Sequence, residues 1–374
     1  MAMTCALASG TVGAIATATP AAAAVSARSS TTPGFNSTVW AVAFRGNVVY
    51  VGGSFTKVSF YGKTYTRKRL AAFDARTGAV LSWNPVADGT VRSLAVAGRA
   101  VYAAGDFSTV SGTRRDSVAR LDAVTGRLTS FRHEFTGKAT TLAIGNGRIY
   151  VGGKFSAVDG KKRGNLAAFR HSSGALDGSW RPRTNDRVKA VAVTRTRVYV
   201  GGGFRTVNGS GRQPRLAAVH PVSGRLITAF RPKAPAIVLD VEADARTVYT
   251  GTGGPGGRAV GYTNYGYVRW THLFDGDVHN IAVLRGVTYA GGHFDRACTT
   301  TSTIKQLGCP KGYAKRIKLA ALDTRGRLTG WNPQANGVHG VQVLSSDTRT
   351  RRVAAGGAFT RIGGARHERF ALFG

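Results

Sequence analysis

The string VVYVGGSF at residues 48–55 decides the fold of this 374-residue chain, because close variants of it recur along the sequence. They are AVYAAGDF (100–107), RIYVGGKF (148–155), RVYVGGGF (197–204), VTYAGGHF (287–294) and RVAAGGAF (352–359). The matching tyrosines, at 50, 102, 150, 199, 249 and 289, are 52, 48, 49, 50 and 40 residues apart. Self-similarity at such a period indicates a repeat architecture in which each unit is one supersecondary element.

Each repeat reads as four short strands. The first alternates apolar and polar residues, as in 90–96, and the second ends at the Gly doublet. The third is the LAAFD-type string of 70–74, and a Thr-Gly turn such as Thr77-Gly78 leads to a fourth strand with an aromatic residue. Those aromatic residues are Trp83, Phe131, Trp180, Phe230, Trp270 and Trp331.

We therefore predict an all-β fold, a seven-bladed β-propeller of four-stranded antiparallel blades, in a single domain over residues 28–374. The blades begin near residues 37, 89, 137, 186, 236, 276 and 337. The fifth lacks the Gly-Gly-x-Phe string, and the seventh stops at Phe373-Gly374 before a fourth strand. Because proteins avoid open sheet edges, we expect the N-terminal segment, from about Arg28 to Ser37, to pair with blade seven and close the ring.

The strings resemble the delta-sixty repeat propellers: VYVGGxF, then LAAxD, Thr-Gly and Trp-x-Pro, as at 83–85, 180–182 and 331–333. The resemblance covers residues from about 37 to 374, and it is looser toward kelch-type propellers. It implies a propeller fold in a family that is common in exported proteins of GC-rich Gram-positive bacteria. It implies no catalytic residues, and the fifth blade and the stretch around Cys298 and Cys309 depart from the pattern.

Residues 1–27 contain no Lys, Arg, Asp or Glu and are rich in Ala and Thr. The strings 22–24 (AAA) and 25–27 (VSA) both fit the small-x-small pattern of a signal-peptidase site, which favours an export signal; the alternative is a disordered leader. Cys298 and Cys309 lie eleven residues apart in an irregular stretch. A disulfide between them suits an exported protein, and two unpaired thiols are the alternative.

The charge is strongly positive, with 52 Lys and Arg against 18 Asp and Glu, a formal net charge of +34. Propeller topology places the loops between second and third strands on one face together with the blade connections. A basic face there would attract an anionic polymer, whereas GC-rich coding and solubility offer a plainer explanation of the arginines. Its candidates are Arg67, Lys68, Arg69, Arg114, Arg115, Lys161, Lys162, Arg163, Arg212, Lys315, Arg316 and Arg366.

The start of each first strand should lie near the mouth of the central channel, where propellers commonly bind small ligands. The ligand-binding candidates there are Trp40, Arg92, Lys189, His279 and His339, with Thr140 and Val238 at the corresponding positions of other blades. An indole at Trp40 could stack on a sugar or a base. Ordinary variation at strand ends is the competing interpretation.

Motifs for catalysis or metal binding are scarce. The eight histidines form no HExxH motif or close pair in sequence, and Gly253-Gly254-Pro255-Gly256-Gly257 lacks the Lys-Ser/Thr of a phosphate loop. Asp275-Gly276-Asp277 is a weak Ca²⁺ signal. We therefore assign no catalytic residue, no metal and no cofactor. One enzymatic alternative remains, a carboxylate pair formed in the channel from Asp186, Asp240, Glu242 and Asp277.

These observations predict a secreted or cell-envelope protein that works as a non-catalytic binding module. The expected partner is an anionic polymer (teichoic acid, acidic polysaccharide or non-specific nucleic acid) or a surface protein, bound by a monomer without a membrane span. Two alternatives stay open: an enzyme acting on carbohydrate or a lactone, and a protein–protein interaction scaffold.

Overall fold

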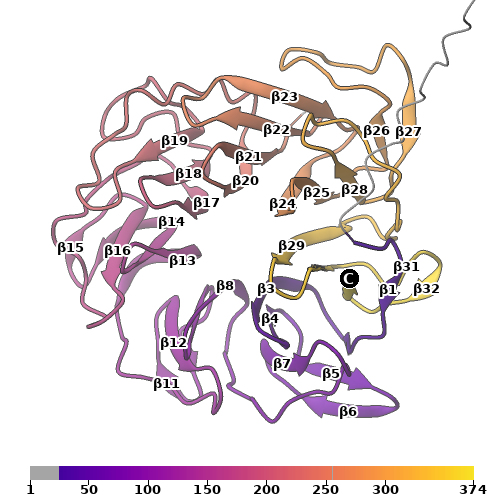
Figure 1. Cartoon of the computed structure of the whole chain (residues 1–374). Helices are drawn as coiled ribbons and strands as arrows, with labels where there is room; N and C mark the ends of the chain where they lie inside the picture. The colour runs from indigo at the N-terminus through magenta and orange to yellow at the C-terminus, as the bar shows by residue number, and fades with distance from the viewer. Residues whose placement is uncertain (1–24, 255) are drawn as a thin grey trace, which may run out of the picture.

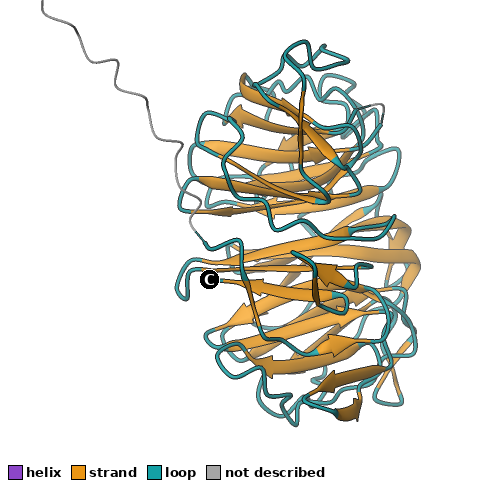
Figure 2. Ribbon diagram, turned by 90° about the vertical axis from the view of Figure 1, so that its right-hand side faces the viewer, coloured by secondary structure: helices purple, strands orange, loops and turns teal. Residues whose placement is uncertain are grey.

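A computed structural model describes residues 25–254 and 256–374; the expected leader up to Ala24, with Cys5, lies outside the described residues. The described part is all-β, with no helix in it. Its sheets are arranged around a common centre, and one strand of each sheet lies nearest that centre, as in a β-propeller (Figure 1). Seen from the side, the strands of successive sheets are stacked one above another (Figure 2).

The innermost strands form a cycle. They are β3 (Val39–Arg45), β8 (Val91–Ala97), β13 (Phe135–Gly145), β17 (Val188–Val193), β20 (Val238–Ala243), β24 (Val278–Leu284) and β29 (Val341–Asp347). Each contacts the next in this order, and β29 contacts β3. The channel mouth is therefore lined by residues that are far apart in sequence.

The second and third strands pair antiparallel behind them. The second strands are β4 (Val48–Gly53), β9 (Ala100–Gly105), β14 (Arg148–Val158), β18 (Val198–Gly202), β21 (Thr247–Thr252), β25 (Val287–Gly292) and β30 (Arg352–Gly357). The third strands are β7 (Leu70–Asp74), β12 (Val118–Asp122), β16 (Leu166–Arg170), β19 (Leu216–Val219), β22 (Arg258–Thr263), β28 (Leu319–Leu322) and β33 (Phe370–Phe373).

The fourth strand differs from the expectation. It is regular in β23 (Val268–Leu273), in the sheet that lacks the Gly-Gly-x-Phe string, whereas the bridge between Phe73 and Val80 and its counterparts are single-residue contacts. In the first repeat the aromatic residue that follows, Trp83, is buried, and Pro85 has no N–H with which to extend the ladder. The outer position beside β33 is taken by β1 (Ser29–Ser30).

The first glycine of a Gly doublet allows adjacent sheets to approach closely, and the second lies against the backbone that enters its own sheet. A Cβ on Gly52 would lie 2.6 Å from Cγ1 of Val91 on the next sheet, and one on Gly53 would lie 2.3 Å from the Thr38 carbonyl oxygen. Neither position can hold a larger residue without a shift of the backbone or of the buried valine. The string that identifies the repeat therefore encodes the packing between neighbouring sheets.

Small hairpins join the second and third strands and lie on the blade connections. They are built from β5 (Lys57–Phe60), β6 (Lys63–Thr66), β10 (Thr109–Val110), β11 (Thr113–Arg114), β15 (Lys161–Lys162), β26 (Arg296–Cys298), β27 (Tyr313–Lys315), β31 (Arg361–Ile362) and β32 (Ala365–Arg366). The connection that enters the first sheet contributes β2 (Gly34–Phe35), which pairs with β5. Bridges such as Ala87–Val110 and Thr184–Val207 tie a hairpin or loop to the connection entering the same sheet. We call the surface formed by these hairpins and connections the hairpin face.

The disulfide prediction is confirmed: Cys298 and Cys309 are joined, with their Cα atoms 5.3 Å apart. The bond closes the long excursion between β26 and β27. No helix in the part of the chain that the structure describes is long and apolar enough to span a membrane.

Candidate functional site at the channel mouth

A β-bulge occupies the same position in every innermost strand. In β3, for example, Val39 pairs with Gly53 and Ala41 with Gly52, so that Trp40 is left out of the register. The bulged residues, which we call the channel ring, are Trp40, Arg92, Thr140, Lys189, Leu239, His279 and Gln342. All of them line one cavity of about 850 Å³. Bulges re-aim side chains, and here each turns one residue toward the channel mouth.

Four of the five sequence candidates, Trp40, Arg92, Lys189 and His279, lie in the channel ring, but His339 does not. His339 is exposed outside the cavity, and its carbonyl oxygen accepts a hydrogen bond from Nε2 of Gln342 at 2.6 Å. Gln342 takes the ring position, because the seventh repeat has a longer entry to its first strand. In the fifth repeat the ring residue is Leu239, one residue after Val238.

In the first, second and sixth repeats, the ring residue contacts a second variable residue fourteen positions later, the x of the Gly-Gly-x-Phe string. Nε1 of Trp40 donates to Oγ of Ser54 at 3.0 Å. Nε of Arg92 lies 2.6 Å from Oδ2 of Asp106. The third such pair is His279 and His293, whose ring nitrogens are 3.4 Å apart. Distance along the sequence does not show that these residues touch. The antiparallel register of the first and second strands brings the two residues of each pair together.

Charge is uneven around the mouth. Burial lowers the pKa of Lys189, and the nearby guanidinium groups of Arg187 and Arg92 lower it further, while Asp277 and Asp186 act in the opposite direction. Burial also lowers the pKa of His279, although its hydrogen bond to a main-chain carbonyl opposes the shift. The mouth is therefore a polar cavity, and around Lys189 the positive charges of Arg92 and Arg187 outweigh the effect of the nearby carboxylates on its pKa.

The channel carboxylates have separate roles. Oδ2 of Asp240 accepts the main-chain N–H of Ile281 on the next sheet at 2.9 Å, and burial raises the pKa of Asp240 to about 6. Asn280 makes the equivalent link to the N–H of Leu344 at 2.7 Å. Glu242 has an exposed surface inside the cavity, yet desolvation there and the neighbouring Asp240 raise its pKa to about 8. Asp240 is thus a link between sheets as well as a channel group.

Several of the expected basic-face residues bond to the main chain instead of facing a partner. Arg115 is buried, and its Nη2 donates to the carbonyl oxygen of Thr129 at 2.7 Å. Arg67, Arg163 and Arg316 make the same bond in their own repeats, to Leu81, Asp177 and Thr329. Arg69 donates to the Ser54 and Phe55 carbonyls. These five arginines each stabilise the backbone of their own repeat.

The other candidates are exposed on the hairpin face: Lys68, Arg114, Lys161, Lys162, Arg212, Lys315 and Arg366. Two of them have acidic neighbours, since Arg366 lies 2.6 Å from Glu368 and Arg114 lies 3.7 Å from Glu134.

A second cavity, of about 640 Å³, opens between the third and fourth sheets and is strongly basic. Lys154, Lys162, Arg181 and Arg183 line it with exposed side chains, above the buried Arg163, and its lining includes no Asp or Glu. Lys154 is the x of RIYVGGKF, and the Trp-x-Pro string after the fourth strand supplies Arg181. We call this cavity the basic pocket. Arg181 and Arg183 lie in a blade connection, where the propeller topology places further basic residues on the same face. Lys154 was not expected in the basic face, although its place in the Gly-Gly-x-Phe string could have indicated it.

One group in the described residues could hold a metal ion: Asp277, His279 and His293, with one ligand atom of each within 4.8 Å of the others. His279 and His293 form no close pair in sequence, but the pairing of β24 with β25 brings them together in space. Asp275 does not join Asp277, since its Oδ1 accepts the N–H groups of Asp295 and Arg296.

No protein-family model and no curated protein matches this sequence. Among solved structures, the chain is similar to the WD40 β-propeller domain of Doa1, with a TM-score of 0.60 and 10% identity over 92% of this chain and 95% of that one. It is also similar to the computationally designed Ika8 protein, with a TM-score of 0.52 and 13% identity over 91% and 97%. BamB from Moraxella catarrhalis matches with a TM-score of 0.48 and 16% identity over 90% and 82%. At these identities the likeness supports the β-propeller fold alone.

Proposed function

We propose that this β-propeller is an exported, monomeric, non-catalytic binding module whose hairpin face binds an anionic polymer of the cell envelope. The basic pocket carries the proposal. Lys154, Lys162, Arg181 and Arg183 are exposed around one cavity without a carboxylate in its lining. Such a cavity suits the phosphate, sulfate or carboxylate groups of a teichoic acid, an acidic polysaccharide or a nucleic acid.

The surroundings of the pocket support a polymer more than a single small anion. The exposed Lys161, beside Lys162 on β15, and Arg212, in the corresponding loop of the next repeat, extend the cationic surface along the hairpin face. The net charge of +34 also favours rapid encounter with polyanions. Release of counterions would then make the affinity steeply dependent on salt.

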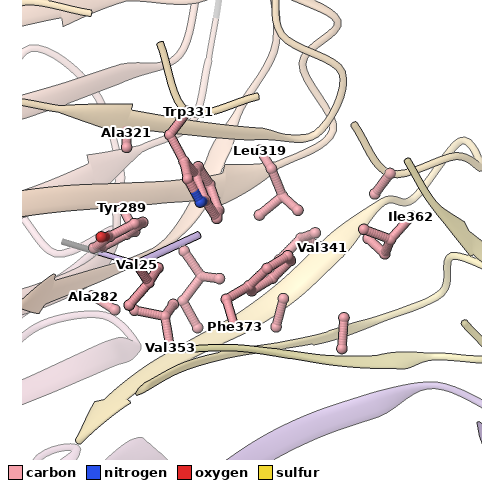
Figure 3. Packing of buried hydrophobic residues seen from close by; sticks show 14 of the residues in the cluster. Val25, Ala282, Tyr289, Leu319, Ala321, Trp331, Val341, Val353, Ile362 and Phe373 are labelled. Carbon is pink, nitrogen blue, oxygen red and sulfur yellow. The ribbon is translucent and has the colours of Figure 1, made fainter. Parts of the chain in front are cut away.

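We also propose seven blades and a ring closed by the N-terminal segment, in a delta-sixty repeat propeller. Supporting this, Ser29 pairs with Phe373 and Ser30 with Leu372. A Cβ on Gly356 would lie 2.5 Å from Val39, the same approach that the doublets make between other neighbouring sheets. Val25 is buried against residues such as Tyr289 and Trp331 (Figure 3).

The test of function uses the full chain and an immobilised polyphosphate, with a neutral glycan as the reference. We expect retention on polyphosphate that collapses between about 50 and 200 mM salt, and no retention on the neutral glycan. The variant K162Q/R183Q should elute at clearly lower salt than the parent. The matched control R195Q/R285Q removes the same charge from exposed turns between first and second strands, at the other end of the sheets.

Equal losses in the two variants would mean that net charge alone drives retention and would overturn the assignment to the basic pocket. Absence of retention at low salt would overturn anionic-polymer binding altogether. Capture of a surface protein that is insensitive to salt and to both variants would favour the interaction scaffold.

A further inference from the structure

Asp277, His279 and His293 form a compact group at the rim of the channel mouth. All three come from one sheet: Asp277 immediately precedes β24, His279 is its bulged residue, and His293 directly follows β25. The antiparallel pairing of Val278 with Gly292 brings the three side chains together. One ligand atom from each lies within 4.8 Å of the other two.

A main-chain hydrogen bond fixes the tautomer of His279. Its Nδ1 lies 3.1 Å from the carbonyl oxygen of Val341 on the next sheet. A carbonyl can only accept, so Nδ1 carries the hydrogen and Nε2 holds a lone pair. That Nε2 faces Nδ1 of His293 at 3.4 Å. In metal sites, a ligating histidine almost always donates its other N–H to a carbonyl or carboxylate in this way.

The carboxylate of Asp277 is held in place by the glycine-rich run of the neighbouring sheet. The N–H of Gly254 donates to its Oδ1 at 2.9 Å. A Cβ on Gly253 would lie 3.1 Å from Oδ2, so a side chain at this position would crowd the carboxylate. The run that only superficially resembled a phosphate loop therefore positions a carboxylate whose remaining lone pairs are available to a ligand.

We propose that Asp277, His279 and His293 bind a divalent transition-metal ion of the zinc class. Two imidazole nitrogens on one tetrahedral zinc ion, each at about 2.05 Å, lie about 3.3 Å apart. The nitrogens of His279 and His293 are 3.4 Å apart. Imidazole and carboxylate ligands suit Zn²⁺, and sets of three protein ligands leave a fourth position open. Because Asp277 and His279 line the channel cavity, that position would face it.

The nearby positive charge sets a limit on the affinity. Lys189 is close enough to act electrostatically on His279 and would repel a cation. One carboxylate and two neutral imidazoles offset this only in part. We therefore expect binding weaker than that of a closed four-ligand structural zinc site, with a fourth ligand supplied by solvent or by an anion in the cavity.

The experiment titrates the untagged, chelator-treated full chain with Zn²⁺ alone by calorimetry and with Co²⁺ alone by visible absorption. We expect one ion per chain, and at least about a tenfold loss of affinity in H293A, H279Q and D277N. H339A is the matched control, since His339 is an exposed histidine outside the group. Zn²⁺ should also raise the Tm of the parent and of H339A but not that of H293A.

H293A changes an exposed side chain, so the metal-free Tm of this variant should equal that of the parent. An equal metal-free Tm shows that a loss of metal binding in H293A does not come from misfolding. The proposal is overturned if the parent binds neither ion stoichiometrically, or if H293A and H279Q bind as tightly as H339A.

Discussion

The guanidinium of Arg92 lies over the indole ring of Trp40, with its Cζ 5.2 Å from the ring centroid, and its Nε contacts Asp106 at 2.6 Å. Trp40 and Arg92 belong to neighbouring sheets, so the contact crosses from one repeat to the next. One face of the indole is thereby covered by a cation that is itself held by a carboxylate. Two neighbouring residues of the channel ring, Trp40 and Arg92, are therefore in direct contact with each other.

The first prediction follows from the charge that Arg92 brings to the mouth. Because Arg92 contributes to the lowered pKa of Lys189, R92Q should raise that pKa toward its usual value, while the effect of burial remains. NMR of reductively methylated lysines measures the shift directly. R195Q removes an equal charge away from the cavity and should leave the pKa of Lys189 unchanged. If the pKa of Lys189 is the same in R92Q as in the parent, the charge of Arg92 does not act on Lys189.

The second prediction concerns Glu242 and pH. Its pKa is raised in the folded chain, from 4.5 to about 8, so the folded state binds more protons than the unfolded state between these values. The contribution of Glu242 to the free energy of unfolding therefore falls as pH rises from 4.5 to about 8. Above about pH 8 the destabilisation by the ionised carboxylate is complete. E242Q should unfold at higher urea than the parent at about pH 9 and at a similar urea concentration at about pH 5. A parallel pH profile in the two proteins would contradict the prediction.

The third prediction separates structural from exposed arginines. R115A removes the buried guanidinium and leaves the partly buried carbonyl of Thr129 without its charged donor, so it should lower the free energy of unfolding by about 1.5–3 kcal/mol. R114A, at the adjacent exposed position, should change it by less than about 0.5 kcal/mol. Urea unfolding of the two variants makes the comparison. R115Q should recover part of the loss, because Gln213 makes the equivalent bond to Ile227 at 2.8 Å in the fourth repeat.

The fourth prediction concerns the N-terminal segment. Nε1 of Trp331 donates to the carbonyl oxygen of Ser26 at 3.1 Å, and Val25 is buried. A chain that starts at Arg28 should therefore be less stable than one that starts at Val25, by about 2–4 kcal/mol. The chain that starts at Val25 should match the full chain. Equal unfolding midpoints for the two truncations would show that these contacts contribute nothing.

The same contacts predict where an export signal would be removed. Cleavage after Ala24 keeps Val25 and Ser26 in the mature protein, whereas cleavage after Ala27 would remove both. We expect the secreted chain to begin at Val25, which N-terminal sequencing or intact mass measurement of culture fluid determines. A chain found only inside the cells would contradict export itself.

The sequence was most informative where packing requires one residue type. The Gly-Gly-x-Phe strings predicted the second strands, because Gly52 and Gly53 touch neighbouring atoms that exclude a Cβ. The repeat pattern gave the wrong residue at two positions of the channel ring, Val238 in place of Leu239 and His339 in place of Gln342. An alternating pattern does not show a bulge, and the bulge moved the ring residue from Val238 to Leu239.

The site was harder to predict, because chemistry at the mouth depends on contacts between strands. His279 and His293 are fourteen residues apart in sequence and become neighbours through the register of β24 with β25. Likewise, composition cannot distinguish Arg115, which bonds to the main chain, from Arg114, which faces solvent. Both arginines count equally toward the net charge, yet only one is available to a partner.

The bulges also bear on how such a chain can change over time. A bulged residue takes no part in the pairing of its strand, and its partner, the x of Gly-Gly-x-Phe, lies just beyond the doublet that packs against the next sheet. Substitutions at these two positions can therefore alter the size and charge of the side chains that line the mouth while the ladder and the inter-sheet core stay intact. An indole with a serine, an arginine with an aspartate, and two histidines already occupy the same pair of positions in a single molecule. The architecture thus separates the chemistry of the mouth from the stability of the fold, and that chemistry can change one repeat at a time.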